Sequence, residues 1–580
     1  MMKKYELDFI NQNLSIEVDE GTTISKACEM AGYPLDLVCN GRGTCGKCKV
    51  TIEDNNENSI VLSCVTKVKS NLKIHLNEEN YIHKANILET SNIDHETLFK
   101  PSLKKMYIDI KSIKNTDNGY LENCDLYVLK KFSNLIYEKG CKGITFISYE
   151  NEIIDVQLND TTSHLYGVSI DIGTTSVVLH VYNLITGELL NTYSSLNMQI
   201  SMGADVISRI MYAQSSKTGL FELNQKIIKT INNLLDKACL DLTKFKDNLY
   251  NIVLCGNSTM QHLLFNLRPD SLGSSPFASI TKDYISCFSE ELQINANNRC
   301  KIIFLPLLGG FVGADTTSVL LTVENDNKNK LIIDLGTNGE IAVGNINKYL
   351  VSSTACGPAL EGGSIECGMR GIFGAIEKCK IENDDVMLKV IGDAKPLGIC
   401  GSGIIDIIAE LLKTNIIDAT GRMLTKEEFI DIKPESKLCA KLVKINDINC
   451  FIIYSDDESK VYLSQKDIRQ IQLAKSSIYS GCMILMKVFN LSLDEIDEII
   501  ISGAFGNYID VDNAMYIGLL PSVDKSKLNN IGNGAGKGVS LYLLNNEMKY
   551  KCDEIVKNTK HYELANDVSF VDEYIKNMNF

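Results

Sequence analysis

The chain reads Ser169-Ile-Asp-Ile-Gly-Thr-Thr-Ser176 and, 163 residues later, Ile332-Ile-Asp-Leu-Gly-Thr-Asn-Gly339. In both stretches an apolar run ends in aspartate and is followed by glycine with hydroxyl or amide residues, which is typical of a strand entering a tight turn. The residues beyond each turn also correspond, because two further strand patterns follow in each copy, at 177–182 and 188–193 and at 340–343 and 349–353. The sequence therefore contains an internal repeat of strand, glycine turn, strand and strand.

A second matched pair lies further along each copy. Asn251-Ile-Val-Leu-Cys-Gly256 and Glu498-Ile-Ile-Ile-Ser-Gly503 are both buried-strand patterns that end at a glycine. Their offset is 247 residues, so the second copy must contain additional residues, and the polar, irregular stretch 420–465 is the predicted insertion. We therefore expect two α/β halves, about 164–325 and 326–580, with their glycine turns facing each other across a cleft.

The two glycine turns have the composition of a phosphate-binding site. Glycines allow backbone N–H groups to approach phosphate oxygens, and threonine hydroxyls add further donors. A carboxylate beside a polyphosphate is repelled unless a cation lies between them, so Asp171 and Asp334 predict a magnesium ion held through water and are the candidate catalytic residues. The candidate phosphate-binding residues are Gly173, Thr174, Thr175, Ser176, Gly336, Thr337 and Asn338.

Two other glycine-rich segments are weaker candidates. The segment 398–403 precedes an apolar helix, and its Gly401 and Ser402 either contact an anion at the helix N-terminus or serve only helix packing. The segment 532–538 resembles a P-loop but has three spacer residues rather than four, and a glycine stands where the magnesium-binding hydroxyl belongs. We expect it to lead into a helix that begins at Val539.

A cysteine cluster stands near the N-terminus, in Cys39-Asn-Gly-Arg-Gly-Thr-Cys45-Gly-Lys-Cys48, and Cys64 follows later in the chain. A long gap, a short gap and a remote fourth cysteine match the plant-type 2Fe–2S arrangement. A four-cysteine zinc site is the alternative, but zinc ribbons show two Cys-x-x-Cys knuckles and only one is present here. Alternating apolar residues at 5–9 and 14–18 predict a hairpin before the cluster.

Length and charge exclude several classes of protein. At 580 residues the chain has room for roughly four domains. Its net charge of −15 argues against nonspecific binding to nucleic acid or to an anionic membrane. No apolar run is long enough to span a membrane, and the charged start Met1–Ile10 lacks the pattern of an export signal, so we expect a cytoplasmic protein.

The predicted domains follow from these patterns. Residues 1–80 form a 2Fe–2S ferredoxin-type domain, 81–103 a polar linker, 104–163 a small α+β middle domain, and 164–580 the duplicated domain.

The paired Asp-x-Gly-Thr turns, together with Ile501-Ser-Gly-Ala-Phe-Gly506, resemble the ATPase superfamily of actin, sugar kinases and heat-shock chaperones. Further segments at 203–210, 256–260, 357–363 and 518–521, preceded by a 2Fe–2S domain, resemble the reductive activators of corrinoid-dependent enzymes. The resemblance implies a multidomain α/β protein with a β-grasp ferredoxin domain and a duplicated actin-like (ribonuclease-H-like) ATPase domain. It also implies adenosine contacts at Gly503, Ala504, Phe505 and Gly506, and cluster ligation by Cys39, Cys45, Cys48 and Cys64.

The function implied by this resemblance is ATP-dependent electron transfer. Such an activator passes one electron from its 2Fe–2S cluster to the inactive cob(II)alamin state of a corrinoid methyl-transfer protein and so restores cob(I)alamin. It needs ATP, Mg²⁺ and an upstream low-potential reductant, and the family suggests a homodimer. The alternatives are an activator of another low-potential enzyme of the dehydratase type, a chaperone-like switch, a sugar kinase, and an electron carrier with a vestigial ATPase fold.

Overall fold

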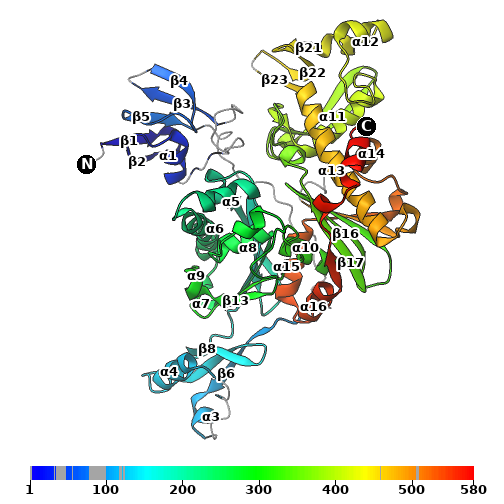
Figure 1. Ribbon diagram of the computed structural model, residues 1–580. Coiled ribbons are helices and arrows are strands. Elements are labelled where there is room, and N and C mark those ends of the chain that lie inside the picture. The colour runs from blue at the N-terminus through cyan, green and yellow to red at the C-terminus, as the bar shows by residue number, and fades with distance from the viewer. Residues whose placement is uncertain are drawn as a thin grey trace.

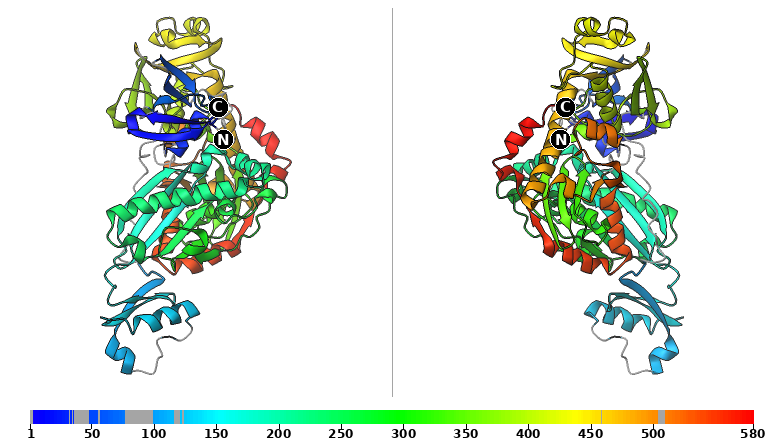
Figure 2. Two further views of the ribbon diagram at one scale, coloured as in Figure 1. Left: turned by 90° about the vertical axis from the view of Figure 1, so that its left-hand side faces the viewer. Right: turned by 90° about the vertical axis from the view of Figure 1, so that its right-hand side faces the viewer.

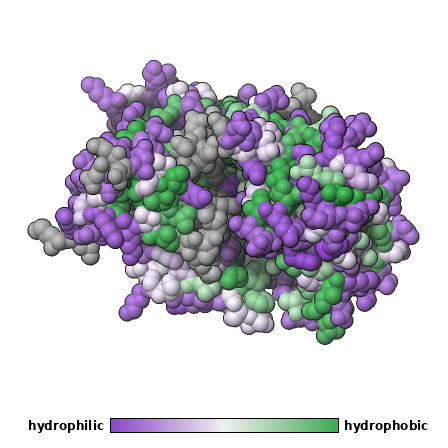
Figure 3. Space-filling model, turned by 90° about the horizontal axis from the view of Figure 1, so that it is seen from above, coloured by the Kyte–Doolittle hydropathy of each residue, from purple (hydrophilic) through white to green (hydrophobic). Residues whose placement is uncertain are grey.

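The computed structural model describes residues 3–31, 33, 35, 48–54, 57–76, 99–115, 121, 124–457, 459–503 and 509–580. In Figure 1 the N-terminal domain lies beside helix α5, and a small domain that contains β6, β7 and β8 projects from the lower end of the first half. Both side views in Figure 2 show the small domain at this same end. Seen from above, hydrophilic and hydrophobic residues are interspersed on the surface (Figure 3). No helix among the described residues is long and apolar enough to span a membrane.

The N-terminal domain is a five-stranded sheet with the strand order β2-β1-β5-β3-β4. The predicted hairpin is confirmed, because β1 and β2 are antiparallel and their alternating side chains place Leu7, Phe9 and Val18 in the domain core. Thr23 begins the helix that follows, since its hydroxyl accepts a hydrogen bond from the Lys26 N–H at 3.3 Å. The elements are β1 (Lys4–Phe9), β2 (Leu14–Asp19), α1 (Ile24–Met30), β3 (Lys49–Asp54), β4 (Glu57–Leu62) and β5 (Leu72–His75).

The small domain is an antiparallel sheet of β6 (Leu103–Asp109), β7 (Gly143–Tyr149) and β8 (Glu152–Leu158), with the helices α3 (Ile110–Asn115) and α4 (Leu126–Leu135). Within the expected linker, residues 81–98 lie outside the described ones. Residues 99–100 are bound to the far end of the chain, because the Lys100 N–H donates to the Leu544 carbonyl at 2.8 Å.

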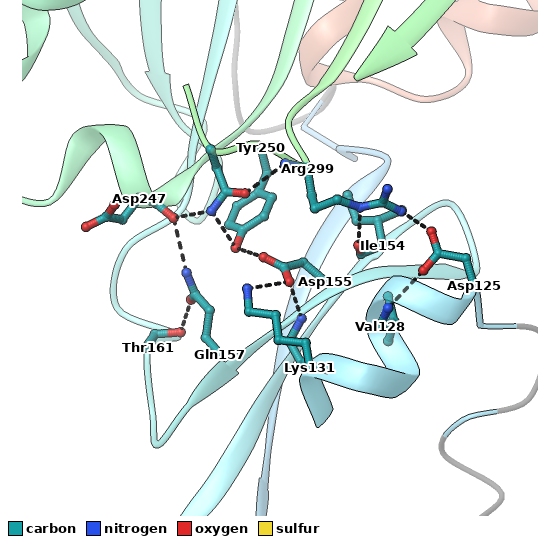
Figure 4. Close-up of polar contacts among 12 residues, drawn as sticks. Asp125, Val128, Lys131, Ile154, Asp155, Gln157, Thr161, Asp247, Tyr250 and Arg299 are labelled. Carbon is teal, nitrogen blue, oxygen red and sulfur yellow. Dashed lines mark hydrogen bonds and ion pairs between the residues drawn. The ribbon is translucent and has the colours of Figure 1, made fainter. Parts of the chain in front are cut away.

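Buried polar contacts hold the small domain against the first half (Figure 4). The carboxylate of Asp155 on β8 is fully buried and accepts from the Tyr250 hydroxyl at 2.6 Å and from Lys131 Nζ at 2.7 Å. Arg299 of the first half forms an ion pair with Asp125 at the start of α4. Because a buried carboxylate needs hydrogen-bond donors, the contact of Asp155 with Tyr250 joins the small domain to the first half.

The two halves of the remaining chain confirm the internal repeat. The first sheet has the strand order β11-β10-β9-β12-β14-β13, and the second has the order β25-β24-β15-β16-β17-β26. In each sheet, three strands that are consecutive in the chain are each antiparallel to the next, β9–β11 in the first and β15–β17 in the second. Two further strands, β12 and β14 or β24 and β25, extend the sheet next to β9 or β15 and run parallel to it. The first comprises β9 (Tyr166–Ile172), β10 (Ser176–Asn183), β11 (Leu189–Leu196), β12 (Leu249–Gly256), β13 (Ile285–Phe288) and β14 (Lys301–Phe304). The second comprises β15 (Lys330–Leu335), β16 (Gly339–Asn345), β17 (Lys348–Thr354), β24 (Glu498–Ser502), β25 (Leu528–Gly532) and β26 (Thr559–His561).

Helices cover both sheets, and one of them crosses from the second half to the first. The 25-residue α13 begins at a capping box in which Ser464 and Asp467 bind each other's backbone N–H groups. Helix α15 follows β25 in the chain but packs on β9 and β12, and its Ser540 hydroxyl lies 2.7 Å from that of Ser169. The helices of the halves are α5 (Val206–Ser215), α6 (Gly219–Asp241), α7 (Phe245–Asn248), α8 (Ser258–Leu264), α9 (Ser289–Leu292), α10 (Ala314–Thr322), α11 (Gly401–Lys413), α12 (Lys426–Ile432), α13 (Gln465–Phe489), α14 (Val511–Tyr516), α15 (Gly534–Leu544), α16 (Met548–Asn558) and α17 (Phe570–Lys576).

Two additional three-stranded sheets belong to the second half. One contains β18 (Ala375–Glu382), β19 (Asp385–Val390) and β20 (Gly398–Ile399), and the other β21 (Leu442–Ile445), β22 (Ile448–Ser455) and β23 (Lys460–Ser464). The expectation that 420–465 is irregular was wrong, because this stretch forms α12 and the β21–β23 sheet. The apolar run at the centre of β22 was the signal for this sheet, and Phe451 and Leu463 are buried in the core of the second half.

Candidate functional site

The first predicted turn joins β9 to β10. The Gly173 N–H donates to the Ser176 carbonyl at 2.9 Å, which closes the turn, and a Cβ on Gly173 would lie only 2.7 Å from that carbonyl oxygen. Thr174 is buried, and its hydroxyl accepts from Asn257 Nδ2 at 3.0 Å. Among the described residues, the N–H groups of Thr174 and Thr175 donate to no protein acceptor. The turn therefore presents two free donors, as an anion site requires.

The second turn joins β15 to β16 and is one residue tighter than the first. The Gly336 N–H donates to the Asn338 carbonyl at 3.0 Å. The Thr337 hydroxyl donates to Glu361 Oε1 at 3.0 Å, so the segment 357–363 supports this turn. In the described part of the chain the N–H groups of Thr337 and Asn338 are also without a protein acceptor.

A glycine at the end of the neighbouring strand supports each turn. Gly256 ends β12 with φ +156° and Gly503 follows β24 with φ +106°, and both values disfavour other residues. A Cβ on Gly256 would lie 2.6 Å from the Ile172 carbonyl oxygen, and one on Gly503 would lie 2.3 Å from that of Leu335. These glycines allow the two strands to approach the Asp-x-Gly turns. The predicted adenosine contacts Ala504, Phe505 and Gly506 lie outside the described residues.

The structure brings the two predicted aspartates within electrostatic range of each other. Burial raises the pKa of Asp171 to about 6, and the negative charge of Asp334 contributes to this shift. Burial likewise raises the pKa of Asp334 to about 6, and Ser502, which is its neighbour in register on β24, partly offsets the increase. Two opposed carboxylates with raised pKa values are the expected environment for a cation.

Two acidic residues of this site were missed by the sequence analysis. Burial, together with the charges of Asp334 and Asp171, raises the pKa of Asp315 at the start of α10. Burial and the charges of Asp315 and Asp334 raise the pKa of Glu340, which lies on β16. A sequence signal for Asp315 was present in Gly313-Ala-Asp-Thr-Thr317, where a glycine and an acid are followed by two hydroxyl residues. Glu340 has no comparable signal around it. Within the described ranges, no three acidic, thiol or imidazole groups are close enough to hold a metal ion directly.

The glycine segment at 532–538 is part of this site, which corrects our expectation for it. Helix α15 begins at Gly534 rather than at Val539, because Asn533 caps it by accepting from the Gly536 N–H at 2.8 Å. The Asn533 side chain also lies beside Asp171 and lowers the pKa of that carboxyl group. The segment therefore reaches the first aspartate.

The segment at 398–403 shows packing contacts. The Ser402 hydroxyl is buried and donates to the Glu377 carbonyl at 2.9 Å. A Cβ on Gly403 would lie 2.2 Å from the Ile376 carbonyl oxygen, so the glycine permits close approach of α11 to β18. These contacts favour the packing alternative for Gly401 and Ser402, and an anion contact there stays a prediction.

The cysteine site is described in part, because Cys39 and Cys45 lie outside the described residues. Cys48 and Cys64 are both buried, and their sulfur atoms lie 3.2 Å apart, too far for a disulfide bond. The two thiols form a small cluster with Leu62 that is separate from the core of the domain. Adjacent, unbridged and segregated thiols fit the ligands of one metal centre.

Comparison with known proteins follows the same division of the chain. Residues 8–69 match the 2Fe–2S iron–sulfur cluster binding domain, residues 166–328 match the RACo middle region, and residues 328–580 match the C-terminal domain of RACo, the ASKHA domain. The RACo middle region thus corresponds to the first half of the duplicated domain and not to the small domain.

Whole-length similarity is also found. The chain is 41% identical over 582 residues to the corrinoid activation enzyme RamQ of Eubacterium limosum, covering 97% of each chain. It is 23% identical over 456 residues to the [Co(II) methylated amine-specific corrinoid protein] reductase of Methanosarcina barkeri, covering 72% of this chain and 77% of that one. A solved reductive activator for corrinoid,iron-sulfur protein superposes with a TM-score of 0.75 at 27% identity, covering 99% of this chain and 98% of the other. The β-grasp ferredoxin and actin-like folds implied by the sequence are thereby confirmed, and the chain belongs to the RACo family of corrinoid-activating proteins.

Proposed function

We propose that this protein is an ATP-dependent reductive activator that passes one electron to the Co(II) state of a corrinoid methyl-transfer protein. The observation that carries the proposal is the pair of facing Asp-x-Gly turns with free N–H donors, in the same chain as the adjacent thiols of Cys48 and Cys64. The similarity of the whole chain to corrinoid activation enzymes supports the same function. The partner is a corrinoid protein, and the electron comes from an upstream low-potential reductant.

The nucleotide is proposed to bind between the two turns. The free N–H groups of Thr174, Thr175, Thr337 and Asn338 point to a polyphosphate, and the Gly503 segment supplies the adenosine contacts. Mg²⁺ is proposed to lie between the phosphates and the carboxylates of Asp171 and Asp334, with water completing its coordination. Asp315, whose pKa is raised toward neutrality, is suited to hold the attacking water and accept its proton.

The electron carrier is proposed to be held by Cys39, Cys45, Cys48 and Cys64. When bound, a 2Fe–2S centre supplies one electron at a time, at roughly −400 mV for the plant type. Reduction of a corrinoid to Co(I) needs a lower potential, so the transfer is unfavourable unless it is coupled to another process. Nucleotide binding and hydrolysis supply this coupling if the closed and open halves differ in their affinity for the corrinoid partner. Dimer formation is proposed from the family resemblance.

The proposal is tested by following the Co(II) electron paramagnetic resonance signal of corrinoid proteins added to the anaerobic, reduced protein. We expect ATP-dependent loss of this signal, and about two iron atoms per chain with negligible zinc. Cys45→Ala should abolish the loss of the Co(II) signal while nucleotide binding persists. Asp334→Ala should remove the dependence of this signal loss on ATP while the signal of the reduced iron centre persists. Zinc in place of iron would refute electron transfer and favour a chaperone-like switch or a kinase.

A further inference from the structure

Two segments that the family resemblance singled out, 203–210 and 256–260, meet behind the first turn, on the side away from its free N–H groups. Arg209 on α5 is fully buried there. Its guanidinium donates to the Thr174 carbonyl, to the Gly203 carbonyl at 2.9 Å and to Gln199 Oε1 at 3.1 Å, and it contacts Met260 Sδ at 3.4 Å. Among the described residues, every atom that accepts a hydrogen bond from this cation is neutral.

The charge of Arg209 is therefore not paired within the described protein. The charge of Asp205 partly offsets the effect of burial on the pKa of Arg209, but its carboxylate caps α5 and accepts from the Ser208 N–H at 2.7 Å rather than from the guanidinium. Burial lowers the pKa of Arg209 to about 9, which leaves the guanidinium charged at neutral pH. Arg299 in the same half is nearly as buried but has a carboxylate partner in Asp125. A buried cation without an anion is costly, so an anion that binds nearby gains from its presence.

The contacts of Arg209 also determine how the turn is oriented. The Thr174 carbonyl is bound by Arg209, and the Gly173 carbonyl is bound by Asn197 Nδ2 at 3.0 Å. In a trans peptide the N–H points opposite to the C=O, so the N–H groups of Thr174 and Thr175 are directed away from these donors. Polarisation of the Thr174 carbonyl further strengthens the Thr175 N–H as a donor in the same peptide unit.

We propose that Arg209 is a positioning residue of the nucleotide site, which orients the first turn and supplies the buried positive charge that balances the nucleotide phosphates. The inference rests on the proposed function, because it requires a polyphosphate at this turn. It predicts that Arg209 contributes to affinity in proportion to the charge of the ligand, whereas a residue that only fills the core would affect all nucleotides equally.

The test measures binding of ATP, ADP and AMP with Mg²⁺ by isothermal titration calorimetry in three variants of the full chain. Arg209→Met removes the charge, and Arg209→Lys keeps the charge but not the forked geometry. Arg299→Met is the matched control, because it removes a buried arginine of the same half at the small-domain end. We expect Arg209→Met to weaken ATP binding roughly 10- to 100-fold and AMP binding less than about threefold. The preference for ATP is the ratio of the AMP and ATP dissociation constants. In Arg209→Lys this ratio should stay within about fivefold of its value in the unmodified protein, and Arg299→Met should not change it.

An unchanged ATP-to-AMP preference in Arg209→Met, or an equal loss of preference in Arg209→Lys, overturns the role of the charge. If Arg209→Met does not yield folded protein, Arg209→Lys serves as the test. Retention of the preference for ATP in this variant supports the role of the charge, and loss of the preference overturns it. If the unmodified protein binds none of the three nucleotides, the proposed function itself fails; if it binds them and Arg209→Met is unaffected, only the present inference fails.

Discussion

Binding of Mg²⁺–ATP is expected to release at least about one proton per chain at pH 6, from Asp171 and Asp334, and clearly less at pH 8. The pKa values of Asp171 and Asp334 are both raised to about 6. Each group is therefore about half protonated at pH 6 and roughly one per cent protonated at pH 8. A cation beside the two carboxylates favours their ionised forms, so both lose their remaining protons when it binds.

Isothermal titration calorimetry measures this number when the same titration is run in two buffers of different ionisation enthalpy, with nucleotide preformed in excess Mg²⁺. At saturating nucleotide, Asp334→Asn should lower the release at pH 6 by at least about half a proton, because one titrating group is gone and the pKa of Asp171 falls without the charge of Asp334. Equal release at pH 6 and pH 8 would contradict the assignment. Proton uptake at pH 6 would show that the carboxylates face the phosphates without an intervening cation.

Three further predictions concern stability. Asp334→Asn should stabilise the nucleotide-free protein by about 3 kcal/mol at pH 7.5, because an ionised carboxylate with a raised pKa is destabilising above that pKa. Chemical denaturation at pH 5 should show this gain reduced by about half. Gly503→Ala should destabilise the second half by about 2–4 kcal/mol, because its φ of +106° and its contact with the Leu335 carbonyl exclude a Cβ; an unchanged melting temperature would contradict this. Tyr250→Phe should cost about 1–3 kcal/mol by removing a donor from buried Asp155, and hydrogen exchange should then increase in β8 and α4 rather than at the nucleotide turns.

The parts of this fold that could be predicted from sequence are those with a local pattern. The Asp-x-Gly turns and their flanking strands could be identified because glycine, aspartate and an apolar run are adjacent in the chain. Asp315 was not, because its role comes from its approach to Asp171 and Asp334, which lie on other strands. Glu340 was also missed, since an acid within a strand is more often exposed than buried.

The start of α15 shows a different limit of sequence reasoning. The helix was expected to begin at Val539, after the glycine-rich run 532–538, and glycine is a poor helix former. Close packing overrides this propensity, because a Cβ on Gly538 would lie 1.8 Å from the Ser318 carbonyl oxygen of α10. Only a glycine at this position allows α15 to approach α10 so closely. The expected start of the helix was therefore several residues too late.

The attachment of the small domain determines where the chain can be cut. Leu103, Ile147 and Ile154 of the small domain belong to the same hydrophobic core as the first half. Lys100 is further joined to the end of α15 by hydrogen bonds in both directions, to Leu544 and from Asn546. A fragment that starts at about residue 164 would expose this apolar surface to water and lose these bonds. An isolated ATPase fragment for crystallisation or kinetics should therefore begin at Phe99, which removes only the N-terminal domain with its electron-carrying cysteines.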